Sequence, residues 1–316
     1  MIDIQDLSKK YGEKKVLDRL SIHVNKGDVL GFIGPNGAGK TTTMKMLCGV
    51  MPVYQGKILL KSFDITRNPL QAKKITGYLP ENAPLYPNMS VEDFLLYAGR
   101  MHGIPEKELP QKLKKAVQRC SLTHVLHEEI DALSKGYKRR VCLAQAIIHE
   151  PEILIMDEPT DGLDPNQKRE IRNLINILKC TTAIVISTHI LEEVEAVCNR
   201  VVVLCAGKKV FDDSTRKFQE MAENIGTMAI EVVPGDLAKA SELFLNHYGS
   251  SLKIASREFR FCCSRDTVEQ EQLQQNILYL AEQHQIALSK SPYSIPAELD
   301  DIFAKLTGKT EGDSGK

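Results

Sequence analysis

A glycine-rich segment near the amino terminus constrains this chain more than any other feature. Residues 34–41 read Gly-Pro-Asn-Gly-Ala-Gly-Lys-Thr, which matches the pattern G-x-x-x-x-G-K-[ST]. The apolar run 28–33 predicts a strand before this loop, and residues 40–48 predict a helix after it. Glycines let successive backbone N–H groups turn toward phosphate oxygens, and the helix begins at the positive end of its dipole. The segment therefore predicts a phosphate-binding loop on an α/β fold.

The side chains of this loop predict how a nucleotide and its metal are held. Lys40 places a mobile positive charge against the β and γ phosphates, and the hydroxyl of Thr41 can ligate Mg²⁺. The expected phosphate-binding residues are Gly34, Pro35, Asn36, Gly37, Ala38, Gly39, Lys40, Thr41 and Thr42. Residues 25–28 match the guanine-reading pattern N-K-x-D, but they precede the loop, so we interpret them as a turn. ATP with Mg²⁺ is therefore the predicted ligand.

Polar side chains follow two further apolar strands, predicted over 153–156 and 183–187. Ligands of parallel α/β sheets bind at the carboxyl ends of the strands, so we expect Asp157 near Mg²⁺. Glu158 is predicted to orient and deprotonate the attacking water. His189 follows the second strand and is expected to contact the γ-phosphate or the water. With the loop lysine, these side chains form the predicted catalytic group.

Residues 133–140 read Leu-Ser-Lys-Gly-Tyr-Lys-Arg-Arg at the start of a predicted helix. With the motifs above, this segment resembles the L-S-G-G-Q signature of ABC-transporter ATPases. The resemblance implies that two chains close head to tail around two ATP molecules. Ser134, Lys135 and Gly136 would then cap the γ-phosphate held by the other chain. Lys135 replaces the first signature glycine and Tyr137 the glutamine, while the serine and the second glycine remain.

The same resemblance extends over about residues 1–215 and assigns four further positions. Tyr11 is similar to the aromatic residue that stacks on adenine. Glu81 stands in place of the glutamine that senses Mg²⁺ and water; it can ligate the ion but cannot donate a hydrogen bond. Asp161 and Asp164 belong to a segment similar to the loop that links the two sites of the dimer. His189, already implicated by its strand, resembles the family's switch histidine.

Alternating strand and helix patterns predict two domains. A nucleotide-binding domain with an α/β P-loop NTPase core is expected over 1–221, with a helical subdomain at about 82–150. A β-α-β-β-α-β pattern predicts a small α+β, ferredoxin-like domain over 222–307, acting as a small-molecule sensor or a dimer contact. Its last helix is expected over 296–306. The polar residues 308–316 are expected to be disordered.

Composition limits the partners. Lys+Arg (41) equals Asp+Glu (41), so no strong field draws the chain to nucleic acid. The eight cysteines include no C-x-x-C pair and indicate thiols in a reducing compartment. No apolar run approaches the roughly 18–20 residues that span a bilayer, and the amino terminus lacks the apolar core of a signal peptide. We therefore expect a cytoplasmic protein, held at the inner face of the membrane by a separately encoded permease.

The signature, residues 81–87 and the small second domain resemble an export-type branch of bacterial ABC ATPases. That branch includes ATPases linked to gliding motility, antibiotic resistance and sodium extrusion. Leu85, Tyr86 and Pro87 either line a groove for a permease helix or cap the helical insert. A DNA-repair ATPase would need long heptad segments, and a translation-associated ATPase would usually carry two motif sets; the sequence has neither. A non-hydrolysing regulator is disfavoured because the full catalytic group is present.

Overall fold

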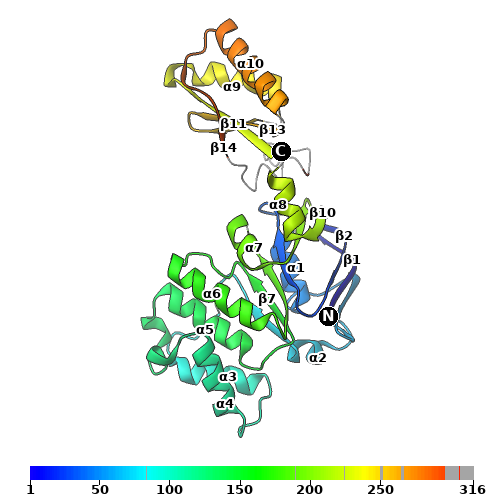
Figure 1. Ribbon diagram of the computed structural model, residues 1–316. Helices are drawn as coiled ribbons and strands as arrows, with labels where there is room; N and C mark the ends of the chain where they lie inside the picture. The colour runs from blue at the N-terminus through cyan, green and yellow to red at the C-terminus, as the bar shows by residue number, and fades with distance from the viewer. Residues whose placement is uncertain are drawn as a thin grey trace. The chain divides into compact units, whose positions relative to one another are not determined.

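The chain divides into two compact units, Met1–Asp212 and Asp213–Lys316 (Figure 1). The computed structural model describes residues 1–82, 84–188, 190–223, 225–249, 252–264, 267–295 and 306. His189, most of the helix predicted over 296–306 and the tail predicted over 308–316 lie outside the described residues. Among the helices in this described part, none is both long enough and apolar enough to cross a membrane.

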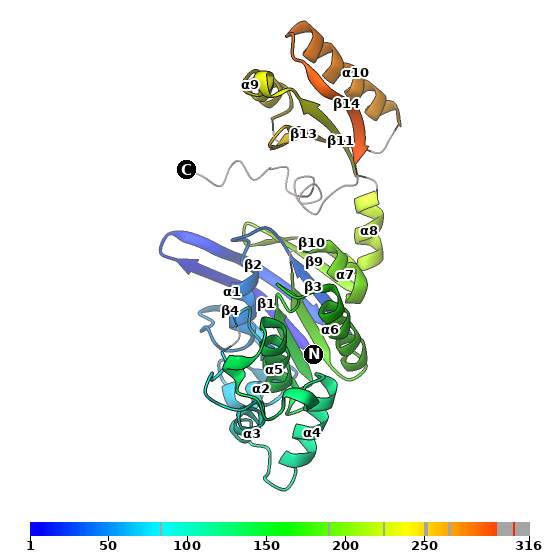
Figure 2. The same cartoon turned by 90° about the vertical axis from the view of Figure 1, so that its left-hand side faces the viewer.

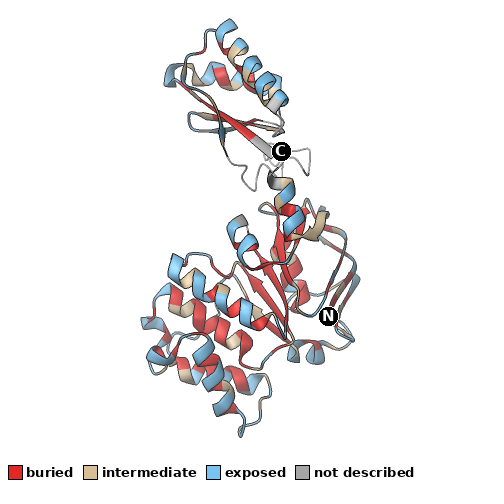
Figure 3. Ribbon diagram, in the orientation of Figure 1, coloured by how far each residue is buried: buried red, intermediate tan, exposed pale blue. Residues whose placement is uncertain are grey.

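A six-stranded sheet with the order β10-β9-β3-β8-β7-β6 forms the centre of the first unit. Its strands are β3 (Val29–Ile33), β6 (Thr76–Leu79), β7 (Ile153–Asp157), β8 (Ala183–Ser187), β9 (Arg200–Cys205) and β10 (Lys208–Ser214). The pairs β6·β7, β7·β8, β3·β8 and β3·β9 are parallel. Strands β3, β7 and β8 are buried along their whole length, as expected of strands covered on both faces of a parallel sheet (Figure 3).

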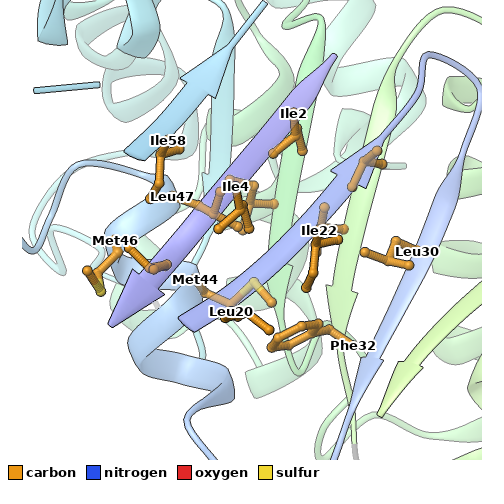
Figure 4. Close-up of a cluster of buried hydrophobic side chains, with 14 of the residues drawn as sticks. Ile2, Ile4, Leu20, Ile22, Leu30, Phe32, Met44, Met46, Leu47 and Ile58 are labelled. Carbon is orange, nitrogen blue, oxygen red and sulfur yellow. The ribbon is translucent and has the colours of Figure 1, made fainter. Parts of the chain in front are cut away.

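A second sheet of four strands has the order β2-β1-β4-β5, and its neighbouring strands are antiparallel. The strands are β1 (Ile2–Tyr11), β2 (Lys14–Val24), β4 (Gln55–Leu60) and β5 (Phe63–Asp64). A hydrophobic cluster joins this sheet to helix α1 (Lys40–Leu47) and to one face of the six-stranded sheet (Figure 4). Leu30 and Phe32 of β3 enter the cluster because alternate residues of a strand share a face. The cluster thereby fixes the helix that follows the phosphate loop.

Helices α5 (Lys135–Ile147), α6 (Pro165–Leu178) and α7 (Leu191–Val197) cover the other face of the six-stranded sheet (Figure 2). Helix α5 approaches β6 very closely. A Cβ atom added at Gly77 would lie 2.1 Å from the carbonyl oxygen of Ala146, so only glycine fits there. Helices α3 (Val91–Met101) and α4 (Leu109–Arg119) pack beside α5 and form the predicted helical insert. The short helix α2 (Pro69–Lys74) was not predicted.

The second unit begins within β10 at Asp213 and continues through helix α8 (Thr215–Glu223), whereas the sequence patterns predicted the domain boundary after residue 221. The elements that follow are β11 (Ile225–Val232), α9 (Leu237–Tyr248), β12 (Leu252–Ala255), β13 (Glu258–Ser264), α10 (Thr267–Gln283) and β14 (Leu288–Ile295). Its sheet has the order β12-β13-β11-β14 with antiparallel pairs. Strand β13 lies between β11 and β12, the first two strands of this domain along the chain, and this order confirms the ferredoxin-like prediction. Phe244 of α9 packs on Phe259 and Phe261 of β13, which joins a helix to one face of the sheet.

Candidate functional site

The predicted phosphate loop lines a cavity of about 540 Å³ in the first unit. The residues that line it are Tyr11, Lys14, Val16, Asn36, Gly37, Gly39, Lys40, Thr41, Thr42, Glu81, Glu158 and Asp161. The loop follows β3, Glu81 follows β6 and Glu158 follows β7, so the carboxyl ends of parallel strands deliver these side chains to one edge. Tyr11 comes from the end of β1 in the other sheet. Segments far apart in the sequence therefore meet around one space.

Lys40 is buried in the loop and is held by its backbone. Its Nζ donates hydrogen bonds to the carbonyl oxygens of Gly34 at 2.6 Å and Pro35 at 3.2 Å. Burial lowers the pKa of Lys40, and the carboxylates of Glu158, Asp157 and Glu81 oppose that shift. One ammonium group thus faces three carboxylates. A polyphosphate with a divalent cation fits this arrangement, because the ammonium would pair with the phosphates and the carboxylates with the cation.

The loop backbone reaches α1 through Gly39, which has a φ of 107°. A side chain is strained at this φ, and a Cβ atom there would lie 2.7 Å from Cδ2 of Leu17. The backbone N–H groups at the start of α1 are consequently presented next to Lys40, Thr41 and Thr42, which all line the cavity. Gly34, Pro35 and Ala38 belong to the same loop but are not among the residues that line the cavity.

Asp157 is 1% exposed at the end of β7. Its Oδ1 accepts a hydrogen bond from the Ser187 hydroxyl at the end of β8, whereas its Oδ2 has no hydrogen-bond partner in the described part of the chain. A buried carboxylate oxygen without a partner is costly unless a cation takes its place. This oxygen fits Mg²⁺, which Thr41 and Glu81 of the cavity would also contact.

No group of three or more His, Cys, Asp or Glu side chains that could hold a metal occurs among the residues described. Magnesium in nucleotide sites does not need such a group, because a hydroxyl, one or two carboxylates and the phosphate oxygens of the substrate supply its ligands. The donor set of Thr41, Asp157 and Glu81 matches that chemistry.

Glu158 has a left-handed backbone conformation, with a φ of 49°. This conformation is uncommon for a residue other than glycine and costs about 1–3 kcal/mol where the surroundings hold it. The N–H of Glu158 donates to the carbonyl oxygen of Ser187 at 3.0 Å, and its own carbonyl accepts from Arg139 Nη2 at 2.7 Å. The backbone is therefore held on both sides while the side chain lines the cavity.

Arg139 is a residue of this region that the sequence reasoning missed. It is 6% exposed, and its guanidinium donates to the carbonyl oxygens of five residues, which are Pro80, Glu81, Asp157, Glu158 and Pro159. Gly136 lies three residues before Arg139 and Leu143 four residues after it, so all three share one face of α5, and both neighbours are buried. An arginine on a buried helix face was the available signal.

The predicted signature residues lie outside the cavity lining. Ser134 is exposed and caps α5, accepting a hydrogen bond from the N–H of Tyr137 at 3.4 Å. Lys135 is exposed, with its Nζ 3.5 Å from Oδ2 of Asp161, which does line the cavity. Gly136 is buried. Of the predicted dimer-loop residues, Asp161 reaches the cavity and Asp164 caps α6.

Comparisons with known proteins give one consistent result. A family model described as ABC transporter matches residues 17–161. Nod factor export ATP-binding protein I of Rhizobium etli is 32% identical over 309 residues, covering 98% of this chain and 93% of that protein. Linearmycin resistance ATP-binding protein LnrL of Bacillus subtilis is 29% identical over 311 residues, covering 98% of this chain and 99% of that protein.

The solved structures agree. A structure of an ATP-binding subunit of an ABC transporter is 30% identical, with a TM-score of 0.65, and the match covers 70% of this chain and 92% of that chain. The resemblance inferred from the motifs is therefore confirmed by a family model, by relatives aligned over nearly the whole chain and by the fold. The chain belongs to the family of ABC-transporter ATP-binding subunits, which are the ATP-hydrolysing subunits of these transporters.

Proposed function

We propose that this chain hydrolyses ATP with Mg²⁺ in a site that a second copy of the chain completes, and that this cycle drives a separately encoded export permease. The observation that carries the proposal is the single cavity lined together by Lys40, Thr41, Glu81 and Glu158. It combines a phosphate-binding cation, candidate metal ligands and a candidate base, which are the parts that phosphoryl transfer to water requires.

Each part of the cavity has a role in this proposal. The ring of Tyr11, 48% exposed at the cavity wall, stacks on adenine. Lys40 and the backbone N–H groups of the loop hold the β and γ phosphates. Thr41, Asp157 and Glu81 hold Mg²⁺, which when bound neutralises charge on the phosphate oxygens. Burial around Asp157 strengthens these electrostatic contacts.

Glu158 acts as the general base. Its carboxylate orients a water molecule toward the γ-phosphorus and takes the proton as the water oxygen attacks. As the bond between the γ-phosphorus and the bridging oxygen breaks, Lys40 stabilises the charge left on the β-phosphate of ADP. His189 is proposed to contact the γ-phosphate or the water from the other side. It lies outside the described residues, so this role stays a prediction from the sequence.

The second copy supplies Ser134, Lys135 and Gly136. In one chain Ser134 is exposed at the first turn of the 13-residue helix α5, and it is not among the residues lining the cavity. Its hydroxyl and the backbone N–H groups beside it form an anion site of the kind that a γ-phosphate fits. Asp161 lines the cavity and Asp164 caps α6, and both are proposed to link the two sites of the dimer.

The permease is proposed to dock at a smaller cavity of about 340 Å³, lined in part by Leu85, Pro87 and Arg139. Tyr86 instead packs edge-on against Phe94 and Tyr97 of α3. This docking would place the chain at the cytoplasmic face of the membrane. The export direction is supported by the names of two relatives, a Nod factor export protein and a linearmycin resistance protein. We propose a regulatory or dimer-contacting role for the second unit.

Mixing two inactive variants tests the composite site. Ser134→Arg blocks the signature with a bulky cation, and Lys40→Ala removes the phosphate-binding cation. Each variant alone is expected to lose ATP hydrolysis, while Ser134→Arg still binds ATP as a monomer. In a mixed dimer one site keeps an intact loop and an intact signature, so mixing should restore part of the activity. Absence of any recovery on mixing, or hydrolysis by Ser134→Arg alone, would contradict the proposal.

A further inference from the structure

Two loops at the edge of the six-stranded sheet are joined by one side chain. The loop after β6 begins at Pro80 and Glu81, and the segment after β7 runs from Asp157 to Pro159. Arg139 of α5 bonds both. Its Nη1 donates to the carbonyl oxygens of Pro80 at 2.5 Å and Glu81 at 2.8 Å. Its Nη2 donates to those of Asp157 at 2.6 Å and Glu158 at 2.7 Å, and its Nε to that of Pro159 at 3.3 Å.

All three nitrogen atoms of the guanidinium are used in this way, and all five acceptors are backbone carbonyls. A buried arginine is ordinarily paired with a carboxylate. No carboxylate lies within ion-pair distance of Arg139 among the residues described; the carboxylates of Asp157, Asp161 and Glu81 are near enough only to oppose the lowering of its pKa by burial. The rigid planar fork of an arginine can reach five fixed acceptors at once, and a lysine ammonium has only three donors.

Holding the backbone at these points holds the side chains that the proposed function uses. Glu158 has its strained φ of 49°, and its carbonyl is one of the five acceptors. The N–H of Asp161 bonds the same carbonyl at 3.2 Å, so Arg139 is one of two donors that hold it. Removing Arg139 would weaken the restraint on the strained conformation and let the carboxylate shift in the cavity. Glu81 is attached to the same guanidinium through its carbonyl, and its side chain lines the cavity from the other loop.

We propose that Arg139 is a positioning residue, which keeps the carboxylates of Glu81 and Glu158 at a fixed separation across the cavity. The inference rests on the proposed function, since it assigns the alignment of the metal ligand and of the base to this guanidinium. Arg139 also lies five residues after Ser134 on α5, less than two helical turns away. The helix that presents the phosphate cap to the second chain therefore also holds the two loops of its own cavity.

The neighbouring Arg140 provides a matched control. It is 8% exposed on the same helix, and its Nη2 pairs with Oε2 of Glu170 at 2.7 Å. Its guanidinium also lies 5.2 Å from the ring centroid of Tyr137. Removing either arginine takes a buried guanidinium from α5, but only Arg139 bonds the two loops. A general loss of helix packing would affect the variants of both arginines, whereas a loss of alignment of the two loops would affect only the Arg139 variants.

The test compares Arg139→Gln, Arg139→Lys and Arg140→Gln in the full chain, each with ATP and Mg²⁺. For Arg139→Gln we expect kcat to fall about ten- to a hundred-fold, because a displacement near 1 Å in a catalytic group has an effect of this size. The Mg²⁺ concentration for half-maximal activity should rise, and the affinity for ATP without Mg²⁺ should change much less than kcat. Arg139→Lys should fall between the parent and Arg139→Gln. Arg140→Gln should melt at a lower temperature with kcat close to that of the parent.

Two results would overturn the inference: Arg139→Gln with the kcat and Mg²⁺ dependence of the parent, or a parallel loss of kcat and ATP affinity in both arginine variants. If Arg139→Gln does not fold, Arg139→Lys decides alone, since a parental kcat in that variant contradicts the alignment role and a reduced kcat with a raised Mg²⁺ requirement supports it. Failure of the proposed function is a separate outcome, because the unmutated chain would then not hydrolyse ATP at all.

Discussion

Polar side chains gather in both units, and they are satisfied in different ways. In the first unit, Asp157 keeps one buried oxygen without a hydrogen-bond partner in the described chain, and Lys40 faces three carboxylates. In the second unit, five polar side chains lie on the sheet face opposite the hydrophobic cluster, and they contact one another. The Tyr293 hydroxyl donates to Oε2 of Glu258 at 2.7 Å, and Arg260 bonds the other oxygen of that carboxylate. Lys290 and Glu231, the remaining two, approach to 3.8 Å.

The first unit therefore has polar groups that a ligand could satisfy, whereas the polar side chains of the second unit satisfy one another. A partnerless buried carboxylate oxygen is costly, so a fold that keeps one gains when a cation binds there. The network in the second unit already provides its acceptors with donors, and it holds β11, β13 and β14 together. We expect substitutions of the residues around the cavity in the first unit to change catalysis, and substitutions within the polar network of the second unit to change only stability.

The largest effect is expected for Glu158→Gln. The amide keeps the shape of the side chain but cannot accept the proton of water, so kcat should fall by about 10²- to 10⁴-fold, the range of general-base catalysis. ATP binding should persist, and ATP-bound dimers should accumulate. Steady-state hydrolysis and size-exclusion chromatography with ATP measure the two effects. Near-normal turnover in this variant would show that Glu158 is not the general base, and the catalytic contrast between the two units would lose its main support.

His149 sharpens the comparison, because its buried Nδ1 also lacks a partner among the described residues, yet it lines neither of the two cavities described above. Its Nε2 donates to the carbonyl oxygen of Thr76 at 3.2 Å, and its ring stacks on His102 with centroids 3.8 Å apart. Burial, with smaller effects from the nearby charges of His102 and Lys112, lowers the pKa of His149 to about 3. A neutral imidazole nitrogen costs much less to leave unpaired than a carboxylate oxygen.

This pKa predicts a loss of stability in acid. Between pH 6.5 and pH 3 the unfolded chain binds a proton at His149 that the folded chain does not, so stability falls as the pH drops through this window. The loss attributable to His149 should reach about 2 kcal/mol at pH 5. Melting temperatures of the parent and of His149→Gln, compared at pH 7 and pH 5, measure it. A parent that loses no more than the variant on acidification would show that this histidine titrates normally.

The smallest effect is expected for Tyr293→Phe in the second unit. The change removes the hydroxyl that donates to Glu258, and we expect a loss of about 1 kcal/mol or less in the stability of that unit because the network is partly exposed to water. kcat and the ATP dependence of hydrolysis should be unchanged. A large change in either would mean that the polar face of the second unit takes part in the ATPase cycle, and the contrast between the units would fail.

Much of this architecture follows from sequence patterns, because buried strands and the phosphate loop have strong local signals. The structure places β8 at Ala183–Ser187, the bounds predicted from the apolar run. The cavity gathers Lys40 and Glu158, which the motifs singled out, and Glu81, which the resemblance to ABC-transporter ATPases implied. Short elements were missed for a physical reason: α2 has only six residues, too few to show a helical period.

Other features had no local signal to read. The apolar pattern of β1 and β2 does not reveal that they form a sheet separate from β3, because pairing depends on distant segments. Arg139 was missed because its acceptors are backbone carbonyls, which any residue type can offer. The sequence therefore identified the side chains that would meet a ligand more readily than the one that holds their backbones.

The close approach of α5 to β6 limits how far apart the helix and the strand can lie. Gly77 stands four residues before Glu81, and a Cβ atom at Gly77 would lie 2.1 Å from the carbonyl oxygen of Ala146. A single methyl group at Gly77 would therefore push helix α5, which Ser134 caps, away from the strand that leads to Glu81. The distance between the proposed nucleotide site and the proposed phosphate cap for a second chain therefore depends on the absence of a side-chain carbon at Gly77.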